Sequence, residues 1–457
     1  MTHILRKGEK GKNIMKNDHA EPRTASEAGW RLSRYNISAK HPENKGFIIV
    51  NLMKGTCITM DPIDMLPLSA LDTLSEDSPV LERYKKAGII VNFDEQAMLE
   101  SLARGACAYP VSVGLTVCPT MGCNFDCPYC FENHKAEKMN AEVQDDIVAL
   151  AERMLNASGA KHLHVTWFGG EPLLAPDVIE SLSDRLIKLS ADKGADYQAT
   201  IITNGYLLDQ EKADMLSRVK VNSYQITLDG IGPAHDATRH LAGGGPTFFR
   251  ITENLRTVKI SGKINIRHNV HAANKGEMEQ LKAFVQTLAE ESGNDLRYYP
   301  APVSGNDASD ERQSNVNLLC GTDSAEVGIM QDSHRFHRGR GHYCMAHHLW
   351  GVGIDEKGRL QKCWEDVDKP EHSFGSAKRW DPKDPLGTAD DPDKLTVYLN
   401  TAGALRDAEC RDCLWLPACC GGCPNKRIYM ERQCVPYKNE PEAYALAVWQ
   451  ARLEKKR

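Results

Sequence analysis

Short runs of β-branched and aromatic residues alternate with longer stretches of helical periodicity through the middle of the chain. Six runs have the composition of strands, and several end at Gly or Pro: Val111–Val117, His162–Phe168, Ala199–Thr203, Tyr224–Leu228, Ile264–Val270 and Leu296–Val303. Between the first two runs, apolar residues recur at the spacing of one helix face: Val143, Ile147, Leu150, Ala151, Met154 and Leu155. Alternating strands and helices predict an α/β fold with a parallel sheet. Six such units predict an incomplete (β/α)6 barrel.

The segment before these units has a different pattern, and we expect it to form a separate winged-helix-like domain over residues 30–105. Strands are expected at Tyr35–Lys40, Phe47–Asn51, Gly55–Met60 and Gly88–Val91, and helices at Ser69–Leu74, Val80–Lys86 and Asp94–Leu102. The segment has no basic helix interleaved with aromatic residues, which argues against nucleic-acid binding. Residues 1–29 are polar and are expected to form a flexible tail.

Composition narrows the class of protein. A chain of 457 residues is long enough for two or three domains, and its net charge of −6 points to neither nucleic acid nor an anionic membrane. No apolar run approaches the roughly 20 residues that span a bilayer, and the N-terminus has no signal-peptide core. We therefore expect a cytoplasmic protein. In such a chain the 15 cysteines, which cluster in two places, favour metal ligands over disulfides.

The first cluster follows the first predicted strand. Cys123, Cys127 and Cys130 form a Cys-x3-Cys-x2-Cys loop. Iron–sulfur clusters are normally held by four thiolates, so three from one loop leave one iron of a 4Fe–4S cluster open to a small molecule. The Cys127–Cys130 pair also has the spacing of a zinc knuckle, and this alternative stays open. The loop is expected at the C-terminal edge of the barrel strands, where active sites of barrels gather.

Polar motifs follow the next strands at the same edge. Gly169, Gly170 and Glu171 follow the second strand; glycines allow a close approach of backbone to ligand, and a carboxylate binds an ammonium group. Asn204, Thr227, Arg239 and Asn269 follow or end later strands, and the planar fork of arginine suits a carboxylate. Each motif also fits turn chemistry or a surface ion pair. His235 and Asp236 are interpreted as structural.

The second cluster lies near the C-terminus. Its members are Cys344, Cys363, Cys410, Cys413, Cys419, Cys423 and Cys434. The run from Cys410 to Cys423 alone contains four thiolates, so a zinc site is an alternative. Cys420 is interpreted as a packed thiol, and Cys57, Cys107 and Cys118 have no assigned role. A histidine-rich tract is interpreted as ordinary loop residues: His334, His337, His342, His347 and His348.

From about Val111 to Pro436 these motifs resemble, in order, the radical S-adenosylmethionine (SAM) enzymes that carry a cysteine-rich SPASM extension. The resemblance implies a barrel at 106–305, a bridging region at 306–343, a SPASM domain at 344–440 and a C-terminal helix at 441–457. It implies that Cys123, Cys127 and Cys130 hold a 4Fe–4S cluster whose free iron chelates SAM, and that cleavage of SAM gives a 5'-deoxyadenosyl radical. By the same resemblance, SAM is contacted by Tyr129, Gly169, Gly170, Glu171, Asn204, Thr227 and Arg239.

The SPASM pattern implies two auxiliary 4Fe–4S clusters. The ligands of the outer cluster would be Cys410, Cys413, Cys419 and Cys434. The inner cluster would use Cys344, Cys363 and Cys423, and its fourth position is either closed by Cys320 or left free for substrate.

The N-terminal segment is similar to PqqD-like leader-recognition domains, although a simple capping domain is an alternative. The resemblance implies a peptide maturase that installs a thioether, carbon–carbon or ether cross-link. Its partners would be a leader-bearing precursor peptide, bound by strand addition, and a reductant such as flavodoxin or ferredoxin.

Two other functions compete with this one. The first is that of anaerobic sulfatase-maturating enzymes, which form formylglycine and carry an aspartate directly after the second SPASM cysteine. This chain has Trp364 there, followed by Glu365 and Asp366. The second is a zinc-stabilised peptide- or DNA-binding protein without catalysis.

Overall fold

A nine-stranded sheet organises the centre of the molecule. The computed structural model describes residues 29–69, 71, 75, 77–108, 110–303, 324–333, 344–401, 407–430, 432 and 434–454. Six neighbouring strands of the sheet are parallel: β6 Ser112–Val117, β7 His162–Trp167, β8 Asp196–Thr203, β9 Val221–Thr227, β10 Lys263–Val270 and β11 Asp295–Pro302. They confirm the predicted incomplete barrel.

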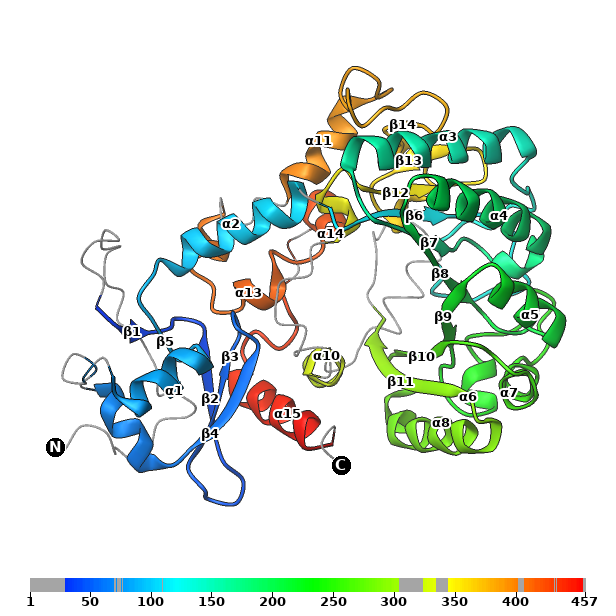
Figure 1. The fold of residues 1–457 in the computed structure, drawn as a ribbon. Coiled ribbons are helices and arrows are strands. Elements are labelled where there is room, and N and C mark those ends of the chain that lie inside the picture. Colours follow the sequence, from blue (N-terminus) through cyan, green and yellow to red (C-terminus); the bar gives the residue numbers. More distant parts are fainter. Residues whose placement is uncertain are drawn as a thin grey trace.

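Helices cover the outer face of these strands (Figure 1): α3 Ala141–Ser158, α4 Pro176–Asp192, α5 Gln210–Arg218, α6 Pro233–Asp236, α7 Phe248–Thr257 and α8 Met278–Ser292. Helix α3 begins where the Asn140 side chain accepts the Val143 N–H, and it ends at Gly159 in the left-handed conformation. None of the described helices combines the length and apolarity needed to cross a membrane.

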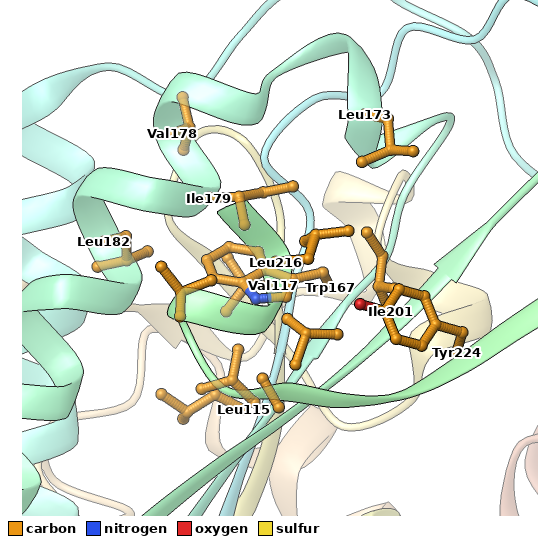
Figure 2. Close-up of a cluster of buried hydrophobic side chains, with 14 of the residues drawn as sticks. Leu115, Val117, Trp167, Leu173, Val178, Ile179, Leu182, Ile201, Leu216 and Tyr224 are labelled. Carbon is orange, nitrogen blue, oxygen red and sulfur yellow. The ribbon is translucent and has the colours of Figure 1, made fainter. Parts of the chain in front are cut away.

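The barrel core lies between the sheet and these helices. Figure 2 shows Trp167 and Val117 of the strands beside Ile179 and Leu182 of α4, and all four are buried. Along β7, buried residues alternate with half-buried ones such as His164. Because successive side chains of a strand point to opposite faces, the half-buried set lines the inside of the barrel.

The C-terminal cysteine-rich segment extends the same sheet. Strand β12 Gly351–Ile354 pairs in parallel with β6, and β13 Arg359–Gln361 and β14 Gly375–Ser376 follow in antiparallel order. Cys363 therefore lies two residues beyond a strand of the barrel sheet. The segment continues in short helices: α11 Pro392–Asn400, α12 Ala408–Arg411, α13 Leu416–Cys419 and α14 Pro424–Tyr429.

The N-terminal unit is built on a three-stranded antiparallel sheet of β2 Asn36–Lys40, β3 Phe47–Asn51 and β4 Thr56–Met60. Strand β1 Arg31–Leu32 pairs with β5 Ile90–Val91, and the helices are α1 Pro79–Ala87 and α2 Glu95–Ala108. The helix expected at Ser69–Leu74 lies mostly outside the described residues, and a 3-10 helix occupies Pro62–Ser69.

Helix α15, Pro441–Glu454, packs against the N-terminal sheet (Figure 1). Its buried residues Tyr444 and Val448 share one apolar cluster with Ile37 and Val50 of the sheet. Helix α10, Ser324–Ser333, lies between α15 and the barrel edge strand β11. The N-terminal sheet, α10 and α15 thus form one packed unit beside the barrel.

Candidate metal and cofactor site

The three-cysteine loop leaves β6 and is held in place by backbone pairing. Phe125 is buried and forms a bridge with Leu241, and the Asp126 N–H donates to the His240 carbonyl at 3.2 Å. Within the loop, the Phe125 N–H donates to Cys123 Sγ at 3.4 Å and the Cys130 N–H donates to the Cys127 carbonyl at 3.1 Å. The segment after α6 therefore anchors the loop that carries the thiols.

The three thiols lie close to one another. Burial raises the pKa of Cys123 to about 12, and the neighbouring Glu171 and Cys127 act in the same direction. Burial and Glu132 likewise raise the pKa of Cys130, with Cys127 and Cys123 adding to the effect. Without a cation these thiols are protonated, whereas a bound metal centre would be held by their thiolates. The loop fits the predicted iron–sulfur site.

The glycines after β7 bring the next turn against this loop. The Gly170 N–H donates to the Thr120 carbonyl at 3.3 Å, and the Glu171 N–H donates to the Gly122 carbonyl at 2.8 Å. A Cβ on Gly170 would lie 2.3 Å from the Gly122 oxygen, and Gly169 has a φ of +97°. The glycines are thus required by the close approach of two backbone segments.

Glu171 joins the ends of β7 and β8. Its carboxylate is fully buried and accepts hydrogen bonds from the Thr203 hydroxyl at 2.7 Å, the Asn204 N–H at 2.7 Å and the Leu173 N–H at 2.9 Å. Burial raises the pKa of Glu171, and these three bonds oppose the rise. A carboxylate has about four acceptor sites, and three of those of Glu171 are occupied. Asn204 in turn donates to Asn124 Oδ1 at 2.8 Å, which ties β8 to the cysteine loop.

Tyr129 and Arg239 meet in a buried network at the same edge. Arg239 Nη1 donates to the Tyr129 hydroxyl at 3.0 Å, and that hydroxyl donates to Asp229. Asn269 Nδ2 also donates to the Tyr129 hydroxyl, at 3.3 Å. Arg239 Nε is buried and has no acceptor among the described residues, so one donor stays available for a ligand carboxylate.

The network contains one residue that sequence reasoning did not select. Asp229 is fully buried and also accepts the Asn269 N–H at 3.1 Å. An acid directly after the fourth strand was the available signal. Thr227, which was selected, is buried at the end of β9 opposite Arg267 of β10.

A second feature missed in the sequence lies beside Cys130. The ligand atoms of Cys130, Glu132 and His134 lie within 4.8 Å of one another, and His134 Nε2 is 3.5 Å from Cys130 Sγ. Burial, with Asp368 nearby, raises the pKa of Glu132 to about 8. The residues after the loop therefore add a possible hydrogen bond to one of its sulfurs.

Four of the C-terminal cysteines line a single cavity: Cys410, Cys413, Cys419 and Cys434. Burial raises the pKa of Cys419 to about 11, and the other three thiols contribute. Basic side chains surround the set: Arg427 Nη2 lies 2.9 Å from Cys410 Sγ, and Lys438 Nζ lies 3.8 Å from Cys434 Sγ. This grouping is the one predicted for the outer auxiliary cluster.

Cys423 is grouped with the remaining thiols. Burial raises the pKa of Cys344, with Cys423 contributing. Burial, with Asp366 and Glu365 nearby, raises the pKa of Cys363 well above its usual value, and Cys344 adds to this rise. Cys344 is thus near both Cys423 and Cys363, which is the grouping expected for the inner cluster, and Cys423 does not line the cavity of the other four thiols. Cys320 lies outside the described residues.

The other singled-out residues have ordinary surroundings. Burial lowers the pKa of His347 and of His348 to about 4, so both are neutral near pH 7. The buried Cys420 Sγ contacts the Pro417 carbonyl at 3.9 Å. His235 and Asp236 are structural: His235 is buried and accepts the Asp229 N–H, and Asp236 accepts the N–H groups at the start of α7. His334, His337 and His342 lie outside the described residues.

Residues 117–287 match the model of the Radical SAM superfamily. The Fe-coproporphyrin III synthase of Methanosarcina barkeri is 26% identical over 194 residues, which are 41% of this chain and 43% of that protein. The PqqA peptide cyclase of Gluconobacter oxydans is 24% identical over 257 residues, 53% of this chain and 68% of that protein. The chain thus covers less than half of the first relative.

The structure of native anSMEcpe with bound AdoMet and Cp18Cys peptide is similar in fold. It is 20% identical, with a TM-score of 0.55, and the likeness covers 76% of this chain and 98% of that chain. Because 76% of this chain is covered, the similarity in fold includes residues outside the six barrel strands.

Proposed function

We propose that this chain, whose residues 117–287 match the Radical SAM superfamily model, is a peptide maturase. It would abstract hydrogen from a ribosomally made precursor and install a thioether, carbon–carbon or ether cross-link between side chains. The observation that carries the proposal is the grouping of seven C-terminal cysteines into a set of four around one cavity and a set of three beside the barrel sheet. The similarity to a PqqA peptide cyclase supports a peptide substrate.

The residues present fit three 4Fe–4S clusters and SAM. Cys123, Cys127 and Cys130 would hold the SAM-binding cluster, and the outer and inner sets would hold the auxiliary clusters. SAM bound at the reduced cluster supplies a 5'-deoxyadenosyl radical that removes hydrogen from a substrate carbon. The buried Arg239 Nε would donate to the SAM carboxylate, and the remaining acceptor of Glu171 would receive its ammonium group.

The substrate would lie between the inner face of the barrel and the turn after Cys363. Trp364 packs on Phe168 at the end of β7, with ring centroids 5.7 Å apart, and Phe168 stacks on Phe131 at 6.3 Å. Burial raises the pKa of Glu365 in the same turn, and the positive charge of Arg267 on β10 opposes this rise. Glu365 therefore lies near β10. The inner cysteine set would therefore be next to the bound peptide.

This turn argues against formation of formylglycine. Trp364 occupies the position of the expected aspartate and is 42% exposed. Asp366 is fully buried, and its carboxylate is engaged by three side chains. Glu365 is the remaining acid of the turn that faces the barrel.

The N-terminal unit is the proposed site for the leader of the precursor. An antiparallel sheet can accept an added peptide strand at an edge. A flavodoxin- or ferredoxin-type reductant would supply electrons.

Co-expression with a candidate precursor tests the function. The account predicts a peptide that has lost two hydrogens and whose backbone fails to fragment between the linked residues in tandem mass spectrometry. Formylglycine made from serine has the same mass change, but its aldehyde reacts with hydroxylamine. A hydroxylamine-reactive product would overturn the cross-linking proposal and support the sulfatase-maturating alternative.

A further inference from the structure

A buried carboxylate lies at the centre of a hydrogen-bond network beside the inner cysteine set. Asp366 is fully buried, three residues after Cys363. Its Oδ1 accepts from Asn425 Nδ2 at 3.0 Å and is 2.9 Å from His372 Nδ1, and its Oδ2 accepts from the Tyr398 hydroxyl. Asn425 Nδ2 also donates to the Tyr398 hydroxyl at 2.9 Å.

No lysine or arginine pairs with this carboxylate within the described part of the chain; His372 is its basic neighbour. Burying a carboxylate is costly unless hydrogen bonds replace its hydration. The donors of Tyr398, Asn425 and His372 provide that replacement, so the anion is held by polar side chains. The negative charge is therefore not cancelled by a neighbouring arginine or lysine.

The network joins the segments that carry two of the three inner thiols. The Asp366 N–H donates to the Cys363 carbonyl at 3.1 Å. Asn425 lies in the first turn of α14, which begins directly after Cys423. Tyr398 comes from α11, and His372 stacks on Tyr429 at the end of α14 with ring centroids 4.3 Å apart. Asp366 thus fixes the Cys363 turn against the helix that follows Cys423.

We propose that Asp366 is a positioning residue for the inner auxiliary cluster and that its buried charge lowers the reduction potential of that cluster. The proposal rests on the proposed function, in which Cys344, Cys363 and Cys423 hold a 4Fe–4S cluster. A nearby negative charge disfavours addition of an electron, because charges interact strongly in a site of low dielectric constant. Potentials of iron–sulfur clusters depend on such surroundings.

The test is a redox titration, followed by electron paramagnetic resonance, of the full chain reconstituted anaerobically with iron and sulfide. Cys363→Ala first identifies the inner-cluster signal. Asp366→Asn, which keeps the shape and removes the charge, is expected to retain the iron content and to move the midpoint potential of that signal upward. Asp407→Asn is the matched control, because Asp407 pairs with Arg427 and Arg432 beside the outer set. Asp407→Asn is expected to leave the midpoint potential of the inner cluster unchanged.

Tyr398→Phe provides a second variant if Asp366→Asn fails to fold. It removes one hydrogen bond to Asp366 but keeps the ring. It is expected to change the line shape of the inner-cluster signal and to leave the signals of the other clusters unchanged. An inner signal with the wild-type potential and line shape in both variants would overturn the role of Asp366 and leave the peptide-maturase function standing. If Cys363→Ala removed no iron, the cluster assignment and this inference would both fail.

Discussion

At the scale of single residues, two adjacent cysteines have different surroundings. Cys419 lines the cavity with three other thiols, whereas Cys420 is buried, adopts a φ of +52° and contacts the Pro417 carbonyl. The resemblance to SPASM enzymes predicted the outer set, whereas spacing alone also allowed a zinc site that uses Cys423 instead of Cys434. Spacing could not predict the roles of Asp229 and Asp366, because the burial and hydrogen bonds of these carboxylates depend on contacts with segments distant in the sequence.

Cys434→Ala and Cys420→Ala test this difference in surroundings. Cys434→Ala removes one of four thiolates and should lower the iron content of the reconstituted protein by roughly one third, the share of one cluster in three. Cys420→Ala should retain the full iron content. Iron and acid-labile sulfide assays measure both variants. Equal iron contents in the two variants would contradict the assignment of the outer set.

Trp364 is the second residue whose role can be isolated. Trp364→Ala removes the ring that packs on Phe168 and should raise the KM for the precursor while SAM cleavage without peptide continues. Phe249→Ala is the control, because Phe249 is an aromatic residue that is 73% exposed on α7. A KM unchanged by Trp364→Ala would remove the turn after Cys363 from the substrate site.

At the scale of elements, the sequence pattern was sufficient to predict the six barrel strands and helix α3. The strands were recognised from runs of β-branched and aromatic residues, and the periodicity of α3 follows from its one buried face. Strands β12 to β14 were not predicted, because they span only two to four residues. They are held by pairing, β12 with β6, β13 with β12 and β14 with β13, rather than by a pattern of their own. This pairing places Cys363 beside the barrel.

The turn after β7 is the element on which the cysteine loop depends. Gly170→Ala would place a Cβ 2.3 Å from the Gly122 oxygen, so the loop must shift. We expect a loss of about 1–3 kcal/mol of unfolding free energy, as for other overpacked sites, together with weaker SAM binding by calorimetry. Gly276→Ala has open space around its Cβ and should change neither quantity. Wild-type SAM affinity in Gly170→Ala would show that the loop geometry does not depend on this contact.

At the scale of the whole molecule, the N-terminal sheet packs against helix α15 near the C-terminal side of the chain. Deleting residues 1–104 would expose the apolar face of α15, including Tyr444 and Val448, so a truncated protein is a poor test of leader binding. Leader binding is therefore better tested with the intact chain, by comparing precursors with and without the leader. A full-length precursor should bind at least tenfold more tightly than the same peptide without its leader, by fluorescence anisotropy. Equal affinities would favour the capping-domain alternative.

The central claim is that the loop of Cys123, Cys127 and Cys130 holds the centre at which SAM is cleaved. The most direct measurement is the formation of 5'-deoxyadenosine from SAM and dithionite by the anaerobically reconstituted chain, quantified by mass spectrometry. The wild-type chain should form it, and the variant with all three cysteines changed to alanine should form none while retaining the iron of the auxiliary sets. Formation of 5'-deoxyadenosine by the triple variant at the wild-type rate would contradict the account.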